Sequence, residues 1–216
     1  LADHLVERAV ETSDGALVWE SGATRVRLGG MSHGATGIGW ALAAASATLA
    51  DREIADAAQR ALGFDDDLFD VRRERWLDAR PESLAQGRLF PTHWCHGTAG
   101  IALARADAAV LLGDDTLLPL ADLGALETAT DLPSDDSLCH GSLGNLMALR
   151  GIESRGGPAA GDYAERVIAR IDRDGPHSGL PSGITTVRGL MVGTAGTLYA
   201  LCRELDPDLP NILLLE

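Results

Sequence analysis

The chain has 216 residues, of which 45% are hydrophobic and only 4% aromatic, so it can bury a core built mainly from Ala, Leu, Ile and Val. Its net charge of -14, from 18 basic and 32 acidic residues, argues against nucleic acid and anionic membrane surfaces as partners. The longest apolar run, residues 38–50, is shorter than the roughly 18 residues that a membrane span requires. Three cysteines, an odd number without a signal peptide, indicate reduced thiols and a cytoplasmic location.

A short glycine frame recurs along the chain and organises it. In its fullest form the frame reads Cys-His-Gly-x-x-Gly, and an apolar run follows it each time. The first glycines of successive frames, Gly34, Gly97, Gly141 and Gly193, are 63, 44 and 52 residues apart. This spacing is long for a tight solenoid but suits a pair of helices with connecting loops in each repeat. The sequence therefore predicts an internal repeat.

The first part of the chain predicts a short outer helix and then an inner and outer pair. Apolar residues at helical spacing predict a helix over residues 2–11, ended by residues 13–15, and residues 16–28 favour an extended piece. Residues 36–50 are apolar almost all round, as in a buried helix, whereas residues 51–62 are apolar on one face. Inner and outer helices are therefore expected to alternate.

The later repeats continue this alternation. The most charged part of the chain, between residues 63 and 88, is predicted to be a solvated helix and loop, with a substrate-contacting loop as the alternative. No composition shift marks a boundary, so we predict one all-α domain over residues 1–216. Further inner helices are expected at 98–112, 142–150 and 194–205, and outer helices at 117–128 and 162–171.

Cys95, Cys139 and His140 stand at corresponding places in the second and third frames. Equivalent positions of neighbouring repeats face the same axis, so these side chains are expected to converge. A helix N-terminus favours thiolate over thiol, which prepares each sulfur for a metal. Two thiolates and one imidazole suit Zn²⁺, and three protein ligands leave a fourth position open, as in catalytic sites. The alternative is a closed, structural site with His96 or His93 as fourth ligand.

The four motifs, in this order, resemble those of the lanthionine synthetase cyclases, the LanC-like domains. The end of the chain, residues 211–216, is similar to that of the class II (LanM-type) lanthipeptide synthetases, whose cyclase domain is C-terminal. The resemblance implies an α/α toroid of seven inner and seven outer helices, of which this chain would hold the last four hairpin repeats. The motifs read Ser-His-Gly-x-x-Gly-Ile at 32–38, Trp-Cys-His-Gly-x-x-Gly-Ile at 94–101, Cys-His-Gly-x-x-Gly-Asn at 139–145 and Gly-Leu-Met-x-Gly-x-Ala-Gly at 189–196.

The resemblance also implies an activity and a site. A cysteine thiolate of a dehydrated precursor peptide would add to a dehydroalanine or dehydrobutyrine of the same peptide, forming lanthionine or methyllanthionine rings. Cys95, Cys139 and His140 match the family's zinc ligands, and His33 matches its acid/base. Zinc deprotonates the substrate thiol, and an imidazole can deliver a proton to the α-carbon near neutrality. The implied partners are the precursor peptide and a dehydratase domain in the same parent chain.

The chain also departs from the family pattern. Three front repeats, with an acidic residue of the active site, are expected ahead of Leu1, and their loss is expected to expose the flank of the helix at 36–50. The arginine usual before the Trp-Cys motif has no counterpart in residues 89–93. Two other classes therefore stay open: a non-catalytic, zinc-stabilised module that binds a peptide or thiol, and a zinc hydrolase on an α/α barrel. Outside the frames, Cys202 is expected in the core and His4 and His177 on the surface.

Overall fold

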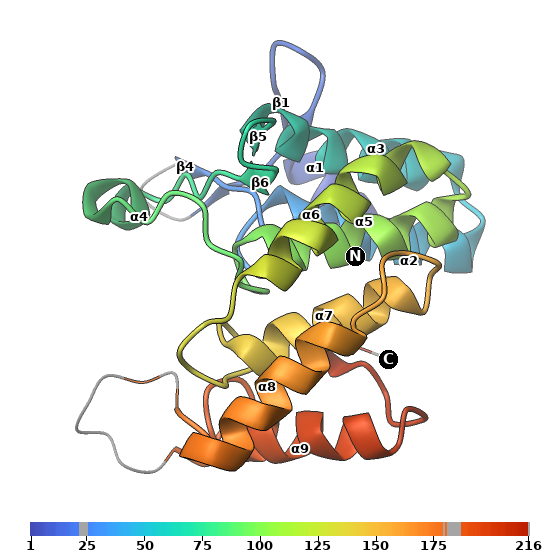
Figure 1. The fold of residues 1–216 in the computed structure, drawn as a ribbon. Coiled ribbons are helices and arrows are strands. Elements are labelled where there is room, and N and C mark those ends of the chain that lie inside the picture. Colours follow the sequence, from blue (N-terminus) through green and yellow to red (C-terminus); the bar gives the residue numbers. More distant parts are fainter. Residues whose placement is uncertain (22–25, 179, 181–186, 216) are drawn as a thin grey trace.

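Helical hairpins follow one another through the chain. The computed structural model describes residues 1–21, 26–178, 180 and 187–215. Neighbouring inner helices pack together in chain order, and each outer helix lies on the inner helix that precedes it, which confirms the predicted alternation. Figure 1 shows them as a row from α2 and α3 in the upper part to α9 at the bottom. The inner helices are α2 (Ala35–Leu49), α5 (Thr98–Leu112), α7 (Ser142–Glu153) and α9 (Thr194–Leu205), and the outer helices are α3 (Arg52–Gly63), α6 (Leu118–Thr130) and α8 (Gly161–Asp174).

Capping residues and the pattern of apolar side chains set these helices. The Asp51 side chain accepts hydrogen bonds from the N–H groups of Glu53 and Ile54, at 2.9 and 3.2 Å, and so begins α3. Gly113, with a φ of 65°, ends α5 in the left-handed conformation that favours glycine. The predicted bounds of α5 and α9 are the observed ones, and α6, α7 and α8 run a few residues past their predicted ends.

Short elements join the hairpins. The first helix, α1 (Ala2–Arg8), ends earlier than predicted because Val10 and Glu11 pair with Val18 and Leu17 in an antiparallel hairpin. The extended piece expected over residues 16–28 is present as short strands. The remaining short elements are β1 (Val10–Glu11), β2 (Leu17–Val18), β3 (Glu20–Ser21), β4 (Val26–Arg27), η2 (Phe64–Leu68), β5 (Phe69–Asp70), β6 (Arg75–Trp76), α4 (Pro81–Gln86), η3 (Asp115–Leu117) and η4 (Ile212–Leu214).

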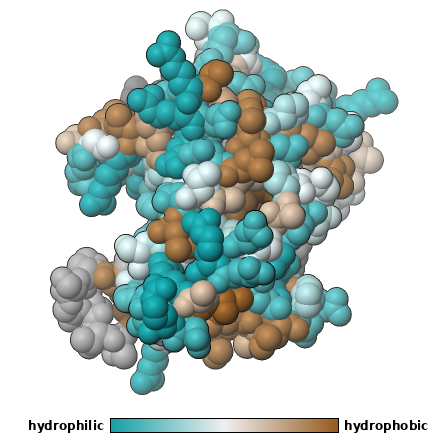
Figure 2. Space-filling view, in the orientation of Figure 1, coloured by the Kyte–Doolittle hydropathy of each residue, from teal (hydrophilic) through white to brown (hydrophobic). Residues whose placement is uncertain are grey.

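The helices at the two ends of the row are partly exposed. The sequence predicts a helix at 36–50 that is apolar almost all round and has one exposed flank, and α2 shows that flank: Ala41 and Ala47 are exposed and Leu49 is 62% exposed. Cys202, expected in the core, is exposed on α9. The reason is geometric: within the described residues, α2 packs on α5 and α9 packs on α7, so each has an inner neighbour on one side. Figure 2 shows apolar side chains gathered over α9 at the bottom of the view.

The second glycine of each frame permits a close backbone crossing. A Cβ on Gly100 would lie 1.8 Å from the carbonyl oxygen of Trp94, and a Cβ on Gly144 would lie 2.0 Å from that of Leu138. Both distances are far inside van der Waals contact, so no side chain fits. The glycines thus let each inner helix begin directly against the loop that carries the thiol or imidazole. Among the described residues, no helix combines the length and apolarity needed to cross a membrane.

Candidate metal centre

Backbone hydrogen bonds connect corresponding residues of the four frames. The N–H of Ser32 donates to the carbonyl of Cys95 at 2.8 Å, and the N–H of Cys95 donates to the carbonyl of Cys139 at 3.2 Å. The N–H of Cys139 donates in turn to the carbonyl of Met191 at 2.9 Å. The main chain therefore places the two cysteines beside each other, as expected for equivalent positions of adjacent repeats.

The side chain of Cys139 contacts both Cys95 and His140. A hydrogen bond from Cys95 lowers the pKa of Cys139 to about 5, and a further hydrogen bond with His140 lowers it as well. The same hydrogen bond to Cys139 raises the pKa of Cys95, and burial raises it further. Cys139 therefore loses its proton more easily than Cys95. The assignment of Cys95, Cys139 and His140 as metal ligands stays a prediction.

His96 and His33 lie on the other side of Cys95. The Nδ1 atom of His96 is 2.7 Å from the sulfur of Cys95, and the ring of His33 is 5.5 Å from the ring of His96. One potential ligand atom from each of these three residues lies within 4.8 Å of the others. His33 is exposed, so a molecule arriving from solvent can reach it. Cys95 therefore lies between Cys139 and His140 on one side and His96 and His33 on the other, all of them residues of types that can bind a metal.

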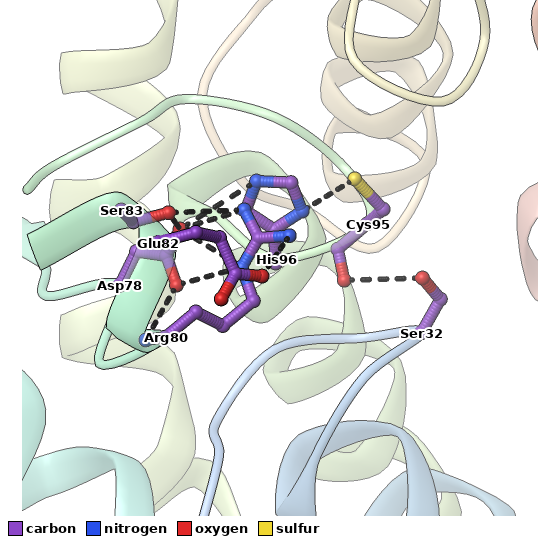
Figure 3. Close-up of polar contacts among 7 residues, drawn as sticks. All are labelled: Ser32, Asp78, Arg80, Glu82, Ser83, Cys95 and His96. Carbon is purple, nitrogen blue, oxygen red and sulfur yellow. Dashed lines mark hydrogen bonds and ion pairs between the residues drawn. The ribbon is translucent and has the colours of Figure 1, made fainter. Parts of the chain in front are cut away.

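Asp78 is a buried carboxylate that faces His96 (Figure 3). Its Oδ2 atom accepts hydrogen bonds from Ser83 Oγ at 2.5 Å and Arg80 Nη2 at 2.8 Å, and it lies 3.6 Å from His96 Nε2. Burial acts to raise the pKa of Asp78, but the hydrogen bonds from Arg80 and Ser83 outweigh it and leave the pKa lowered. Asp78 is therefore held as an anion next to an imidazole.

Sequence reasoning missed Asp78 and Arg80. They precede α4, in a charged region interpreted mainly as solvated, and no periodicity distinguishes them from their exposed neighbours. The available signal was their position shortly before the second frame. The backbone hydrogen bond from Asp78 to Leu89, at 2.8 Å, closes this segment into a loop that returns directly to the site.

His93 completes a row of imidazoles. Its ring lies 5.3 Å from that of His96 and 5.8 Å from that of His140. Burial, together with the charge of His140, lowers the pKa of His93, so the ring is neutral. Its Nδ1 atom is buried without a hydrogen-bond partner among the described residues. His33, His96, His93 and His140 thus line the pair of thiols.

The donor set fits a soft divalent metal. Two cysteine sulfurs and several imidazole nitrogens lie close together, and each can donate a lone pair to a cation once it has lost its proton. Sulfur and imidazole nitrogen are the ligands that zinc prefers in proteins. A carboxylate behind one imidazole is also the usual support of a metal-binding histidine.

Hairpins of inner and outer helices, with thiols and imidazoles gathered where the inner helices begin, define an α/α protein with a candidate metal centre. The profile of the lanthionine synthetase C-like protein family matches residues 3–214, and the chain belongs to this family. The family resemblance of the four motifs is thereby confirmed.

Two known proteins are similar to this chain. LcnDR2 of Lactococcus lactis subsp. lactis, a lacticin 481/lactococcin biosynthesis protein, is 27% identical over 149 residues, which cover 61% of this chain and 16% of that protein. The solved structure of nisin cyclase matches with a TM-score of 0.78 at 18% identity, covering 99% of this chain and 59% of that one. The match confirms the predicted α/α toroid architecture. The chain spans less than two thirds of the length of either protein.

Proposed function

We propose that this chain is a lanthionine cyclase domain, which joins cysteine thiols of a precursor peptide to dehydroalanine or dehydrobutyrine residues of the same peptide. The observation that carries the proposal is the pairing of Cys95 with Cys139 in adjacent frames, next to His140 and the exposed His33. Membership of the family supports it, as do the names of the two relatives.

Cys95, Cys139 and His140 would hold a zinc ion. When bound, zinc supplies a Lewis acid that converts the substrate thiol, mostly protonated at neutral pH, into a thiolate. The two protein sulfurs contribute negative charge to this site, which keeps the attacking sulfur electron-rich. A set of harder ligands would favour hydroxide chemistry, so the two cysteines argue for thioether formation over the hydrolase alternative.

The bond changes in the proposed reaction balance without any co-reactant. The substrate sulfur forms a bond to the β-carbon of the dehydro residue, and the alkene electron pair moves onto the neighbouring carbonyl as an enolate. His33 then gives a proton to the α-carbon. Nothing leaves the peptide, because the proton lost by the thiol balances the proton gained by the carbon.

His33 fits the role of proton donor by position. It is exposed and in ring contact with His96, and one of its nitrogens lies within 4.8 Å of the ligand atoms of Cys95 and His96. A substrate carbon can therefore approach both the thiol site and this imidazole. A positioned acid of this kind contributes about 10²–10⁴-fold to a rate.

Arg80 supports the catalytic alternative over a module that only binds peptide. Residues 89–93 hold no arginine, yet Arg80 lies beside the site, because it pairs at 2.8 Å with Asp78, the carboxylate that faces His96. This cation favours negative charge in the site. It is also suited to hold a carbonyl group of the peptide during the addition.

The substrate would be a ribosomally made peptide with dehydrated serine or threonine residues and free cysteines. A dehydratase must act before this step, and we propose that it belongs to the same parent protein, in the cytoplasm. The acidic chain, with its net charge of -14, favours a basic or neutral peptide.

The test measures ring formation by the full-length protein. Addition does not change the peptide's mass, so remaining free thiols are counted by alkylation and mass spectrometry. We expect His33→Ala to retain zinc and peptide binding and to form rings about 10²–10⁴-fold more slowly. His4→Ala, which changes an exposed histidine outside the frames, is the control. Loss of zinc would make His33 a ligand, and an unchanged rate would remove it from the mechanism.

A further inference from the structure

We propose that His96 is a fourth ligand of the metal, through Nδ1, when no substrate is present, and that Asp78 is the positioning residue that holds this imidazole. The inference rests on the proposed zinc site and changes its character, from three protein ligands to four. It concerns residues that lie outside the predicted ligand set of Cys95, Cys139 and His140.

His96 Nδ1 lies 2.7 Å from the sulfur of Cys95, one of the proposed ligands. One potential ligand atom from each of His33, Cys95 and His96 lies within 4.8 Å of the others. A metal ion held by Cys95 would therefore lie within reach of His96. His96 is also the residue next to Cys95, so the same loop fixes both atoms.

Asp78 favours the tautomer of His96 that carries its proton on Nε2. Asp78 Oδ2 lies 3.6 Å from Nε2, on the opposite edge of the ring from Cys95. A neutral imidazole that turns its Nε2–H towards a carboxylate has no proton on Nδ1, whose lone pair then faces the sulfur. Metal-binding histidines are commonly held in this way, with the far nitrogen donating to a carboxylate.

Asp78 is held in place by its neighbours. Its side chain is only 3% exposed, and Arg80 and Ser83 hydrogen-bond to its oxygens (Figure 3). Arg80 Nε lies 3.0 Å from Oδ1, and Arg80 Nη2 lies 2.8 Å from Oδ2. A carboxylate held in this way cannot turn to find another partner. The segment around α4 therefore serves to present one oxygen to His96.

Of the four proposed ligands, His96 is placed to be exchanged for the substrate thiol. Its ring contacts that of His33, the exposed residue that we propose as proton donor. The substrate thiol must arrive on this side to place its partner carbon near His33. His96 would thus close the metal site at rest and give up its place to the incoming thiol.

The test uses cobalt in place of zinc, because the visible absorption of Co²⁺ reports ligand number and type. In His96→Ala we expect a changed cobalt spectrum, zinc affinity at least tenfold lower in chelator competition, and recovery of the spectrum when free imidazole is added. In Asp78→Asn we expect zinc affinity to fall about 10–100-fold. Glu82→Gln is the matched control, since Glu82 also pairs with Arg80, at 3.9 Å, but is exposed.

Two results would overturn the inference. A wild-type cobalt spectrum and zinc affinity in His96→Ala would exclude His96 as a ligand, and wild-type affinity in Asp78→Asn would exclude the role of Asp78. Circular dichroism checks folding, and His96→Gln replaces His96→Ala if the alanine variant is unfolded. Cys139→Ala separates the two proposals: metal retained in that variant refutes the zinc site itself, whereas metal lost there with His96→Ala unchanged refutes only the fourth ligand.

Discussion

The backbone N–H of Cys95 donates a hydrogen bond to the carbonyl oxygen of Cys139, 3.2 Å away, although 44 residues separate the two cysteines. Similar bonds connect Ser32 with Cys95 and Cys139 with Met191. Main-chain groups make all three bonds, so the arrangement of the frames does not depend on the thiols. Because these bonds need no thiol side chain, we expect the two cysteines to be replaceable without loss of the scaffold.

The first prediction follows from this independence. Cys139→Ala should fold but lose its metal, whereas the wild-type chain should bind one zinc ion. Since a ligand that binds only the folded state stabilises it, a chelator should lower the melting temperature of the wild type and leave that of Cys139→Ala unchanged. Elemental analysis and thermal denaturation check both statements. Cys202→Ala, which removes an exposed thiol on α9, should behave as wild type.

The second prediction concerns the frame glycines. In Gly100→Ala the new Cβ would lie 1.8 Å from the carbonyl oxygen of Trp94, an atom of the backbone that cannot rotate away. We expect a loss of stability at or above the upper end of the roughly 1–3 kcal/mol range typical of overpacked sites. Urea denaturation measures the free energy of unfolding.

Gly161→Ala is the matched control for this prediction. Gly161 is the first residue of α8, and a Cβ there would meet nothing within 4 Å. Alanine is the better helix former by about 1 kcal/mol in a helix interior, so the control should be neutral or more stable. Equal losses in the two variants would mean that the crossing at Trp94 is not tight.

The frames explain why so much of the fold was predictable. A glycine requirement at Gly100 or Gly144 is local and absolute, so it leaves a clear trace in the sequence next to an apolar run. The repeat of that trace located α5 and α9 at their observed bounds and anticipated that Cys95 and Cys139 would meet. Because corresponding residues of neighbouring repeats lie side by side, the repeat alone predicted this tertiary contact.

The parts that could not be predicted depend on non-local contacts. Asp78 and Arg80 are ordinary members of a charged stretch until the chain closes between Asp78 and Leu89. Cys202 has the apolar neighbours of a core residue, but α9 packs on one side only within the described residues, and the cysteine falls on the open side. Helical periodicity reports that a helix has an apolar face, not whether another helix covers it.

The third prediction uses the buried carboxyl of Asp65. Burial raises its pKa to about 7, against the opposing effects of a hydrogen bond from Thr36 and the charge of Arg105. The folded state therefore keeps a proton that the unfolded state loses near pH 4. Between about pH 4 and pH 7 the folded state binds more protons, so stability falls as the pH rises, by up to about 4 kcal/mol.

Asp65→Asn removes this ionisation and should remove the corresponding pH dependence. Urea midpoints of the metal-free protein at pH 5 and pH 8 should differ less in this variant than in the wild type. Asp172→Asn changes an exposed carboxylate on α8 and should keep the wild-type difference. The same pH dependence in wild type and Asp65→Asn would show that Asp65 is ionised throughout.

The fourth prediction concerns an apolar cavity of about 700 Å³ beside the frames. Met31, Trp94 and Met191, each next to or within a frame, line it together with Trp40 and Leu190. Cavities of this size and character bind apolar molecules, so a hydrophobic dye should bind there and receive energy from the two tryptophans. Leu190→Asp should weaken dye binding at least tenfold, because it places a charge in the apolar wall. Leu198→Asp changes an exposed leucine on α9 that does not line the cavity, and should leave this signal unchanged. If instead Leu198→Asp abolished the signal and Leu190→Asp did not, the dye would be bound on α9, and the cavity beside the frames would be closed to apolar groups.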